Sequence, residues 1–447
     1  MGKTRPAIVI IIAICIILAG VVLLHIPVSG TTPVSIPDEK VKTTYDVLIP
    51  PGNGNSTEVD HIILRGGSQQ DIGYALARIA IDKYGATLIS YDDPVYGKAR
   101  EEYIRLHDPG MYQRIQGIKK AYGQKADDYS QDASSLIYIF SYPFCSAIYF
   151  PPDSTQDHHA YSGKDLEWIY NPQMNEFNVA NFLNPKALMI NRVRNRINVV
   201  EIYPDDGYAT LVVGSLDLAN GAFDGINEKG LSVTVLEDSD TYVDPGTAGA
   251  GGTSEGLNFL QLGRSVLGNC ASVEEAKDRI LENRVSMPYM GAHFLISDPY
   301  GNATIVEFDN VSRKARFTDY HNVPVPVTNY AIYLTPDYTN LRITDPGDIG
   351  DDYYRMHKLH GYIDTHAGLF NETDIRAALK LVEANAHTSA DEILPGTTIR
   401  LVYTDVTDLN EKTMTVRFYL RDGPVSDPAW GTHELVMSEP FTFRLKP

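Results

Sequence analysis

Hydrophobic and polar residues alternate along much of the chain, in short runs separated by turn residues. One run covers residues 141–150 and a second covers 160–168, with a polar turn between them, so this segment predicts a β-hairpin. The same alternation predicts further strands at residues 198–204, 208–217, 223–238, 292–309, 314–320, 325–330, 398–420 and 439–445. A fold rich in hairpins is therefore expected.

Fewer segments have the spacing of a helix. After a strand at residues 62–64 and a Gly-Gly turn, Ser68 is suited to cap a helix in which Ile72, Leu76 and Ile79 share one face. Further helices are expected at residues 257–267, 272–283 and 374–385. Strands therefore outnumber helices among the expected elements.

The first residues form a hydrophobic segment that is suited to a membrane. Lys3 and Arg5 precede 18 apolar or small residues without a charge, which is long enough for a short membrane span. The basic flank would stay in the cytoplasm, so the rest of the chain is expected outside it. We expect a signal anchor at residues 1–30 and a Thr- and Pro-rich linker at residues 31–44. A cleaved signal peptide ending near Ser29, with a secreted product, is the alternative.

Composition and charge narrow the range of functions. A chain of 447 residues is long enough for one large core with additional segments. Its formal net charge of −19 argues against a nucleic-acid partner, because such a surface requires clustered Lys and Arg. No nucleotide loop is present, and the histidines His158, His159, His357 and His360 lack the spacing of a metal site. No cofactor and no metal are therefore expected.

Cys145 is the residue best suited to nucleophilic chemistry. It lies near the start of the predicted hairpin, and the second strand brings Lys164 and Glu167 back towards it. A thiol is only partly ionised at neutral pH and needs a nearby base. If Cys145 were the first residue of a cut chain, its own α-amino group would supply that base. A buried structural cysteine is the alternative interpretation.

Five motifs, in order along the chain, resemble the cysteine branch of the N-terminal-nucleophile (Ntn) hydrolases. This branch includes choloylglycine hydrolase, acid ceramidase, N-acylethanolamine acid amidase and the penicillin acyltransferases. Residues 145–146 resemble the Cys-Ser/Thr pair that begins its catalytic chain, and 163–167 resemble its Gly-Arg-Asn-hydrophobic-Asp motif. Residues 227–231 resemble a turn between its core strands, 328–330 its oxyanion segment, and Arg355 an arginine at the start of a helix.

The resemblance implies both a fold and a domain organisation. The expected fold class is α+β, as a four-layer αββα Ntn-hydrolase sandwich of antiparallel sheets. The catalytic domain would span residues 145–447 and follow a pro-region or small subunit at residues 45–144. Self-cleavage before Cys145 would produce two subunits that stay associated.

The resemblance also implies an activity. The chain would be a self-processing cysteine amidohydrolase or acyltransferase that cleaves a linear, non-peptide C–N amide bond through a thioester on Cys145. Its partner would be a small N-acyl amide, and Glu237 stands where the ceramidase and ethanolamide-amidase group has a glutamate. Asn329 would donate to the oxyanion, and Glu167 would hold the α-ammonium group. The expected catalytic residues are Cys145, Lys164, Glu167, Glu237, Asn329 and Arg355.

Three residues depart from the family motif. Lys164 replaces an arginine, and a point charge does not replace a planar, forked guanidinium at a bidentate site. Glu167 is one methylene longer than the family aspartate, and Asp165 stands in place of asparagine. A second hypothesis is therefore a membrane-tethered surface or binding protein that keeps the Ntn fold with altered or absent catalysis.

Overall fold

The computed structural model describes most of the chain from Lys40 onward. The described residues are 40–50, 57–91, 93–134, 144–170, 196–214, 218–238, 240–241, 244, 255–287, 291–343, 351–383, 398–427 and 432–446. Within these ranges no helix is long and apolar enough to cross a bilayer. The anchor expected at residues 1–30 and most of the linker expected at 31–44 lie outside the described residues.

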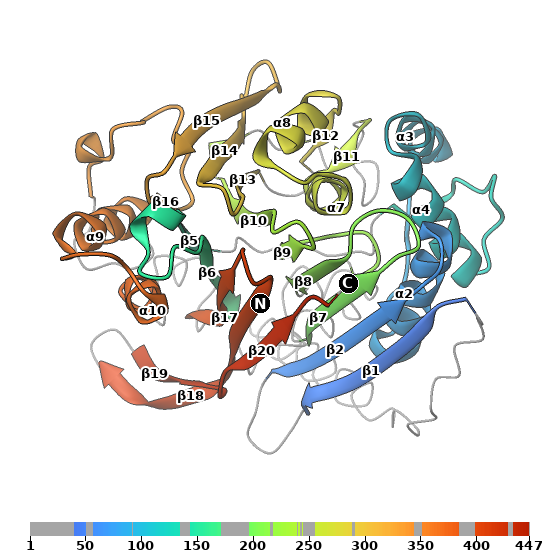
Figure 1. Ribbon diagram of the computed structural model, residues 1–447. Coiled ribbons are helices and arrows are strands. Elements are labelled where there is room, and N and C mark those ends of the chain that lie inside the picture. The colour runs from blue at the N-terminus through green and yellow to red at the C-terminus, as the bar shows by residue number, and fades with distance from the viewer. Residues whose placement is uncertain are drawn as a thin grey trace, which may run out of the picture. The chain divides into compact units, whose positions relative to one another are not determined.

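The larger of the two main sheets has nine strands, in the order β1-β2-β7-β8-β9-β10-β13-β14-β15 (Figure 1). Their bounds are β1 Lys42–Ile49, β2 Glu58–Arg65, β7 Arg196–Tyr203, β8 Thr210–Gly214, β9 Asp224–Asn227, β10 Ser232–Glu237, β13 Ala292–Ser297, β14 Asn302–Phe308 and β15 Ala315–His321. All neighbours are antiparallel except β2 and β7, which are parallel. The prediction of purely antiparallel sheets is wrong at this pair. Parallel neighbours need a long crossover, which the helices and the hairpin between β2 and β7 provide.

The second main sheet has seven strands and contains the predicted hairpin. Its strands are β16 Val325–Val327, β5 Phe144–Phe150, β6 Tyr161–Tyr170, β17 Thr398–Asp408, β18 Thr413–Asp427 and β19 Thr432–Met437, with β20 Phe441–Arg444 paired to β18. Strands β5 and β6 pair with Cys145 opposite Leu166 and Ala147 opposite Lys164. The hairpin predicted from residues 141–168 is therefore confirmed over its described part, and Lys164 lies on the same sheet face as Cys145.

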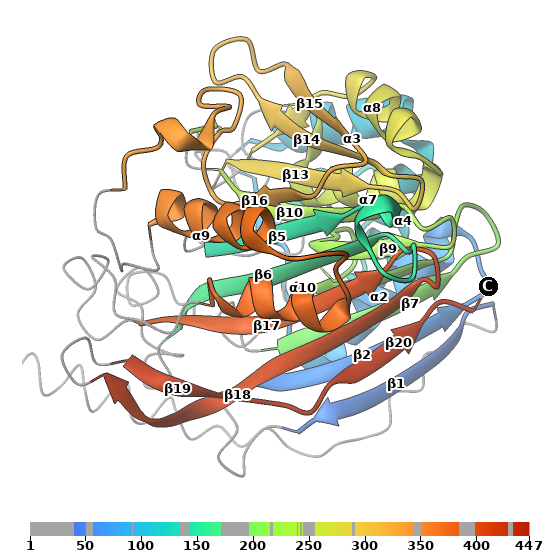
Figure 2. The ribbon, with the colours of Figure 1, turned by 60° about the vertical axis from the view of Figure 1, so that its left-hand side comes forward.

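Helices cover the outer faces of the two sheets. They are α2 Gln69–Tyr84, α3 Pro94–His107, α4 Pro109–Ala121, α7 Phe259–Asn269, α8 Val273–Leu281, α9 Asp352–Thr365 and α10 Glu372–Lys380. Short elements complete the described chain: β3 Ile89–Ser90 with β4 Gln131–Asp132, β11 Leu257–Asn258 with β12 Val285–Ser286, and the 3-10 turns η1 Pro152–Ser154 and η2 Tyr338–Asn340. Figure 2 shows α9 and α10 in front of β5, β6 and β17.

Two observations define the layers. On the outer face of the second sheet, Ile148 and Phe150 share a hydrophobic cluster with Leu359 of α9 and Ile375 of α10. On its inner face, the Tyr149 hydroxyl crosses to the larger sheet and donates to the Asp298 carbonyl at 3.0 Å. The order of layers is therefore helix, sheet, sheet, helix, as expected for the α+β fold.

Helices α2 and α4 pack backbone to backbone through two glycines. A Cβ atom on Gly73 would lie 2.2 Å from the Arg114 carbonyl oxygen, and one on Gly117 would lie 2.0 Å from the Gln70 carbonyl oxygen. Neither position has space for a side chain, because the obstructing atoms belong to the backbone. These glycines therefore set the short separation of the two helices.

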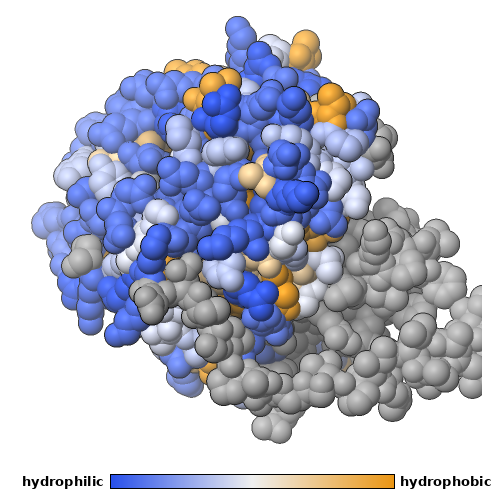
Figure 3. Space-filling view, turned by 90° about the vertical axis from the view of Figure 1, so that its right-hand side faces the viewer, coloured by the Kyte–Doolittle hydropathy of each residue, from blue (hydrophilic) through white to orange (hydrophobic). Residues whose placement is uncertain are grey.

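The segment predicted as the pro-region, residues 45–144, is part of the larger sheet. It supplies most of β1 and all of β2, and α2 to α4 pack beside them (Figure 1). The backbone N–H of Gly67 donates to Asp205 at 3.0 Å, and Arg100 donates to Ser286 at 3.0 Å. Figure 3 shows that the face on this side of the molecule is largely hydrophilic, with scattered hydrophobic residues. The segment thus packs as an integral layer of the domain.

Candidate active site

The peptide unit of Cys145 is held from both sides by side chains that are distant in sequence. Its N–H donates to Oδ1 of Asn329 at 2.7 Å, and its carbonyl accepts from Nη1 of Arg355 at 2.5 Å. Asn329 follows the edge strand β16, and Arg355 lies in the first turn of α9. Cys145 itself is fully buried in β5. The fold therefore brings three of the six predicted residues into direct contact.

Arg355 also organises the groups around that peptide. Its guanidinium donates to Oγ of Ser146 at 2.8 Å, to Oδ1 of Asn329 at 2.9 Å and to Asp352 at 2.5 Å. Because Oδ1 of Asn329 receives donors from two directions, the amide orientation is fixed, and Nδ2 donates to the Glu237 carbonyl at 2.8 Å. One of the two Nδ2 hydrogens expected to serve an oxyanion is thus already used within the protein.

Lys164 lies beneath the nucleophile, but its partner is a residue that the sequence did not reveal. Its Nζ atom is 3.0 and 2.9 Å from the two carboxylate oxygens of Asp224, and it donates to the Val235 carbonyl at 2.5 Å. The Tyr403 hydroxyl donates to the same carboxylate. All four residues are buried. The ammonium group therefore links the second sheet to β9 and β10 of the larger one.

Glu167 lies on the other face of the hairpin. Strand alternation places it with Asp165 and Ser146, away from Lys164, and its Cα partner across the hairpin is Phe144. It is buried beside the peptide bond that precedes Cys145. Lys164 and Glu167, which were expected to face the thiol together, therefore lie on opposite faces of the hairpin. The carboxylate next to Lys164 is that of Asp224.

The electrostatic surroundings keep the Cys145 thiol neutral in the uncut chain. Burial raises the pKa of Cys145 to about 12, against the charge of Lys164, which lowers it, and with Glu167 and Asp224 raising it further. A backbone hydrogen bond from Glu237 lowers the thiol pKa by a smaller amount. At neutral pH the sulfur must therefore pass its proton to a base before it can attack.

Several carboxyl groups near the thiol have raised pKa values. Burial raises the pKa of Glu237 to about 9, Asp352 and Asp238 add to the effect, and Arg355 opposes it. Burial and the Asp224 charge raise the pKa of Asp405 to about 8. Glu237 is therefore protonated at neutral pH and can donate a hydrogen bond as well as accept one.

Four residues of this network were not among the predicted six: Ser146, Asp224, Asp352 and Tyr403. Asp224 stands three positions before Asn227, in a run that was interpreted only as strand and adjoining turn. Tyr403 has no local signal, because it belongs to an ordinary alternating strand whose pairing with β6 brings it to the site. Partners that depend on strand order are not visible in local patterns.

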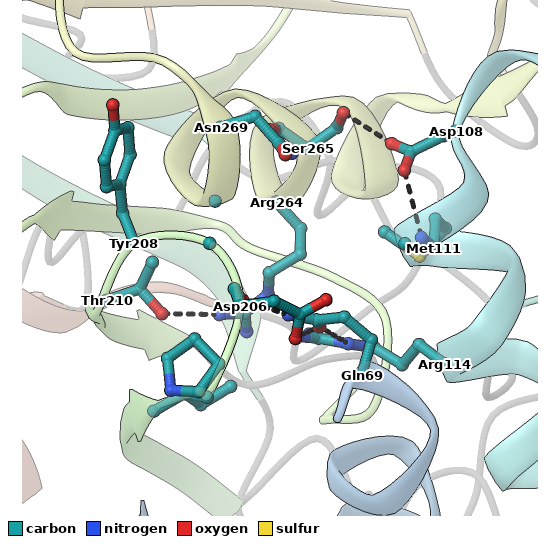
Figure 4. A pocket seen from close by; sticks show the side chains of 15 residues that line it. Gln69, Asp108, Met111, Arg114, Asp206, Tyr208, Thr210, Arg264, Ser265 and Asn269 are labelled. Atoms are coloured by element: carbon teal, nitrogen blue, oxygen red, sulfur yellow. Dashed lines mark hydrogen bonds between the residues drawn. The ribbon is translucent and has the colours of Figure 1, made fainter. Parts of the chain in front are cut away.

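A small polar cavity lies elsewhere, between the predicted pro-region and the catalytic segment (Figure 4). Its volume is about 80 Å³, and none of the six predicted residues lines it. Asp108 accepts a hydrogen bond from Ser265 at 2.6 Å and forms an ion pair with Arg279 at 2.9 Å. Gln69 reaches across to the Asp206 carbonyl at 3.1 Å. The cavity is part of the contact between the two segments.

Fold and site together define a class. Two facing sheets lie between helices, and the peptide of a cysteine at the start of a buried strand is held by an asparagine and an arginine, which agrees with the α+β fold expected from the sequence. Residues 189–383 match the family model described as acyl-coenzyme A:6-aminopenicillanic acid acyl-transferase, which confirms the resemblance predicted from the sequence. The match includes Glu237, Asn329 and Arg355, whereas Cys145, Lys164 and Glu167 precede it. No curated protein matches the chain.

Solved structures give similarities at low identity. A penicillin V acylase from Agrobacterium tumefaciens is 16% identical over 61% of this chain and 83% of its own, with a TM-score of 0.41. A variant of the conjugated bile acid hydrolase from Clostridium perfringens is 14% identical over 68% of this chain and 97% of its own, with a TM-score of 0.46.

Proposed function

We propose that the chain is a self-processing cysteine amidohydrolase or acyltransferase that acts on a linear, non-peptide C–N amide bond. One observation carries this proposal: the Cys145 peptide is clamped by Asn329 at its N–H and by Arg355 at its carbonyl. An ordinary structural cysteine would not need two buried polar side chains fixed on its backbone, because strand pairing would satisfy those groups.

The first step is cleavage of the Phe144–Cys145 bond. The thiol attacks the Phe144 carbonyl, the C–N bond breaks, and the nitrogen takes up a proton to become the free α-amine. Water then hydrolyses the resulting thioester, which leaves a carboxyl group on Phe144 and restores the thiol. Arg355 and Asn329 keep the peptide in place during this change, and Glu167 lies across the hairpin from the bond that breaks.

Cleavage supplies the base that the buried thiol needs. An α-amine titrates near pH 7.7–8.0, so part of it is unprotonated at neutral pH and can accept a proton. The hydrogen bond to Asn329 would keep this amine beside its own sulfur. The amine accepts the thiol proton, the sulfur attacks the substrate carbonyl, and the leaving amine departs with a proton from the α-ammonium group. Water or an acceptor amine then resolves the thioester.

Two aspects of this proposal extend beyond the site. The substrate class is a small N-acyl amide, because the network contains a nucleophile and hydrogen-bond donors in a buried setting suited to acyl transfer. The location is outside the cytoplasm on a retained N-terminal anchor, with a secreted form as the alternative, since basic residues precede the hydrophobic run. Protease added to intact cells should then digest the domain.

The decisive experiment compares the full chain with its Cys145→Ala variant. N-terminal sequencing of the purified full chain should find a fragment that begins at Cys145, and the variant should remain one chain. Wild-type protein is then tested on N-acyl ethanolamines, N-acyl amino acids, phenylacetyl amides and bile-salt amides, with thiol alkylation abolishing turnover. A folded, active protein with an intact Phe144–Cys145 bond refutes the mechanism. Cleaved protein that turns over none of these amides favours the non-catalytic surface protein.

A further inference from the structure

Three buried side chains converge behind the loop that carries Asn329. Asp238 follows β10, His293 lies in β13 and Glu307 lies in β14, and these strands are adjacent in the larger sheet. One ligating atom from each lies within 4.8 Å of the other two. All three residues have 0% exposed surface. No step of the proposed amide chemistry uses this cluster.

His293 has the geometry of a ligand rather than of a hydrogen-bonded core histidine. Neither ring nitrogen has a partner at normal hydrogen-bond distance and angle among the described residues; Glu307 and the Thr328 backbone are polar neighbours of the ring, and Nδ1 lies 3.8 Å from Oε1 of Glu307. The chain forms direct histidine–carboxylate contacts elsewhere, at 2.9 Å for His61 and 2.8 Å for His159. Two ligands with metal bonds of about 2.0–2.2 Å in a tetrahedral site are separated by roughly 3.3–3.6 Å, so the observed 3.8 Å needs only a small inward shift to hold an ion between them.

The two carboxylates are already oriented by the protein. Glu307 accepts the backbone N–H groups of Ile332 and Tyr333 at 2.5 and 2.9 Å, one on each oxygen. Asp238 accepts from the backbone of Asp240 at 2.9 Å. Such outer hydrogen bonds fix metal-binding carboxylates while leaving further lone pairs for the ion. The ligating groups are therefore pre-arranged on a rigid support.

The charge balance of the cluster also favours a cation. Two carboxylates lie in a dry interior with one imidazole, and buried charges need compensation. A divalent cation would compensate both carboxylates with the imidazole neutral.

We propose that Asp238, His293 and Glu307 bind a divalent transition-metal ion that secures the 328–333 loop to the larger sheet. One imidazole with two carboxylates suits Zn²⁺ best, with Mn²⁺ or Fe²⁺ as related occupants, whereas Mg²⁺ and Ca²⁺ prefer all-oxygen sites. The ion is structural, and the proposal does not depend on amidase activity. The sequence predicted no metal site, because the three ligands lie in or next to three different strands and are not spaced as in a recognised metal-binding motif.

The test begins with the full chain, purified through a tag that binds no metal. Elemental analysis should find about one Zn²⁺, Mn²⁺ or Fe²⁺ per chain. Removing it with a chelator should lower the thermal unfolding midpoint, and adding Zn²⁺ or Mn²⁺ should restore it, because an ion that binds only the folded state stabilises that state. A wild-type chain that contains no transition metal and takes up none in a titration overturns the proposal.

Variants locate the ion. Asp238→Asn and His293→Gln should lose the metal, whereas His61→Gln, which alters a direct histidine–glutamate pair in another part of the sheet, should retain it. Cys145→Ala and Cys270→Ala should also retain it, which separates this site from thiolate binding. If Asp238→Asn and His293→Gln bind as much metal as the wild type, the assignment is wrong. If either variant fails to fold, the titration of chelator-treated wild-type protein decides.

Discussion

Replacing Asp224 by asparagine should destabilise the domain through the lysine that it neutralises. Lys164 and Asp224 are 1% and 2% exposed at their side chains, and Nζ contacts both carboxylate oxygens at 2.9 and 3.0 Å. Removing one member of a buried pair leaves the other charge without compensation, which typically costs about 3–5 kcal/mol. Asparagine keeps the shape and can still accept a hydrogen bond from Lys164, so we expect about 3 kcal/mol.

The measurement is urea unfolding at neutral pH in the Cys145→Ala background, where one uncut chain unfolds. The double variant Lys164→Met/Asp224→Asn removes both charges and should regain at least about 1 kcal/mol relative to Asp224→Asn alone. Glu101→Gln is the matched control. Glu101 and Lys119 form another buried pair at 2.7 Å, on α3 and α4, so its loss of stability should be similar.

Self-cleavage should distinguish the Lys164–Asp224 pair from the Glu101–Lys119 pair. In the Cys145-containing chain, Asp224→Asn should slow self-cleavage, because it disturbs the cation beneath the thiol, whereas Glu101→Gln should cleave at the wild-type rate. The reasoning fails if the free energy of unfolding of Asp224→Asn is within about 1 kcal/mol of that of its parent while that of Glu101→Gln is lower by about 3 kcal/mol. It also fails if the double variant is no more stable than Asp224→Asn, since the two charges would then be uncoupled.

Three further predictions concern the oxyanion donor, pH dependence and helix packing. Asn329→Ala should lower turnover by the cleaved enzyme about 100-fold or more, and exposed Asn340→Ala should not; an unchanged rate for Asn329→Ala would remove its assigned role. Because folding raises the pKa of Glu237 from 4.5 to about 9, its contribution to stability is complete below about pH 4.5 and is lost as the pH rises through about 9. Glu237→Gln should therefore make the decrease in urea midpoint between about pH 5.5 and 8.5 shallower, and an unchanged decrease would contradict this. Gly117→Ala should destabilise the chain by about 1–3 kcal/mol in urea, because its Cβ would meet a backbone carbonyl. Gly123→Ala is the control: this exposed glycine has open space around it, so its substitution measures the cost of a positive φ without a steric clash.

Local patterns predicted the pieces of the fold better than their arrangement. Alternation located the β5–β6 hairpin, and Ser68 caps α2 as expected, with a reciprocal bond to Asp71. The parallel pairing of β2 with β7 was missed, because β-strand alternation in a single sequence does not specify which neighbour a strand will have. The same limit applied to the site: Cys145 and Lys164 were found, whereas Asp224 and Tyr403 require knowledge of strand order.

Motif order explains why the more distant site residues were nevertheless identified. Asn329 and Arg355 lie in an edge-strand turn and a helix start, positions that hydrophobic periodicity does not distinguish from others. Their assignment came from the family resemblance, and the structure places both against the Cys145 peptide. The Asp238, His293 and Glu307 cluster belonged to no recognised motif, so neither periodicity nor resemblance indicated it.

The parallel β2–β7 pair has a consequence for the order of events during biogenesis. Eight consecutive Cα partners, from Glu58 with Arg196 to Arg65 with Tyr203, join segments on opposite sides of the proposed cleavage point. Assembly as one polypeptide is a first-order process, but after the cut, two separate chains would have to meet again. Denatured mature protein should therefore refold with a yield that depends on concentration, whereas the uncut Cys145→Ala chain should not. The uncut chain would therefore fold readily, whereas the two subunits of the mature enzyme would reassemble poorly after denaturation.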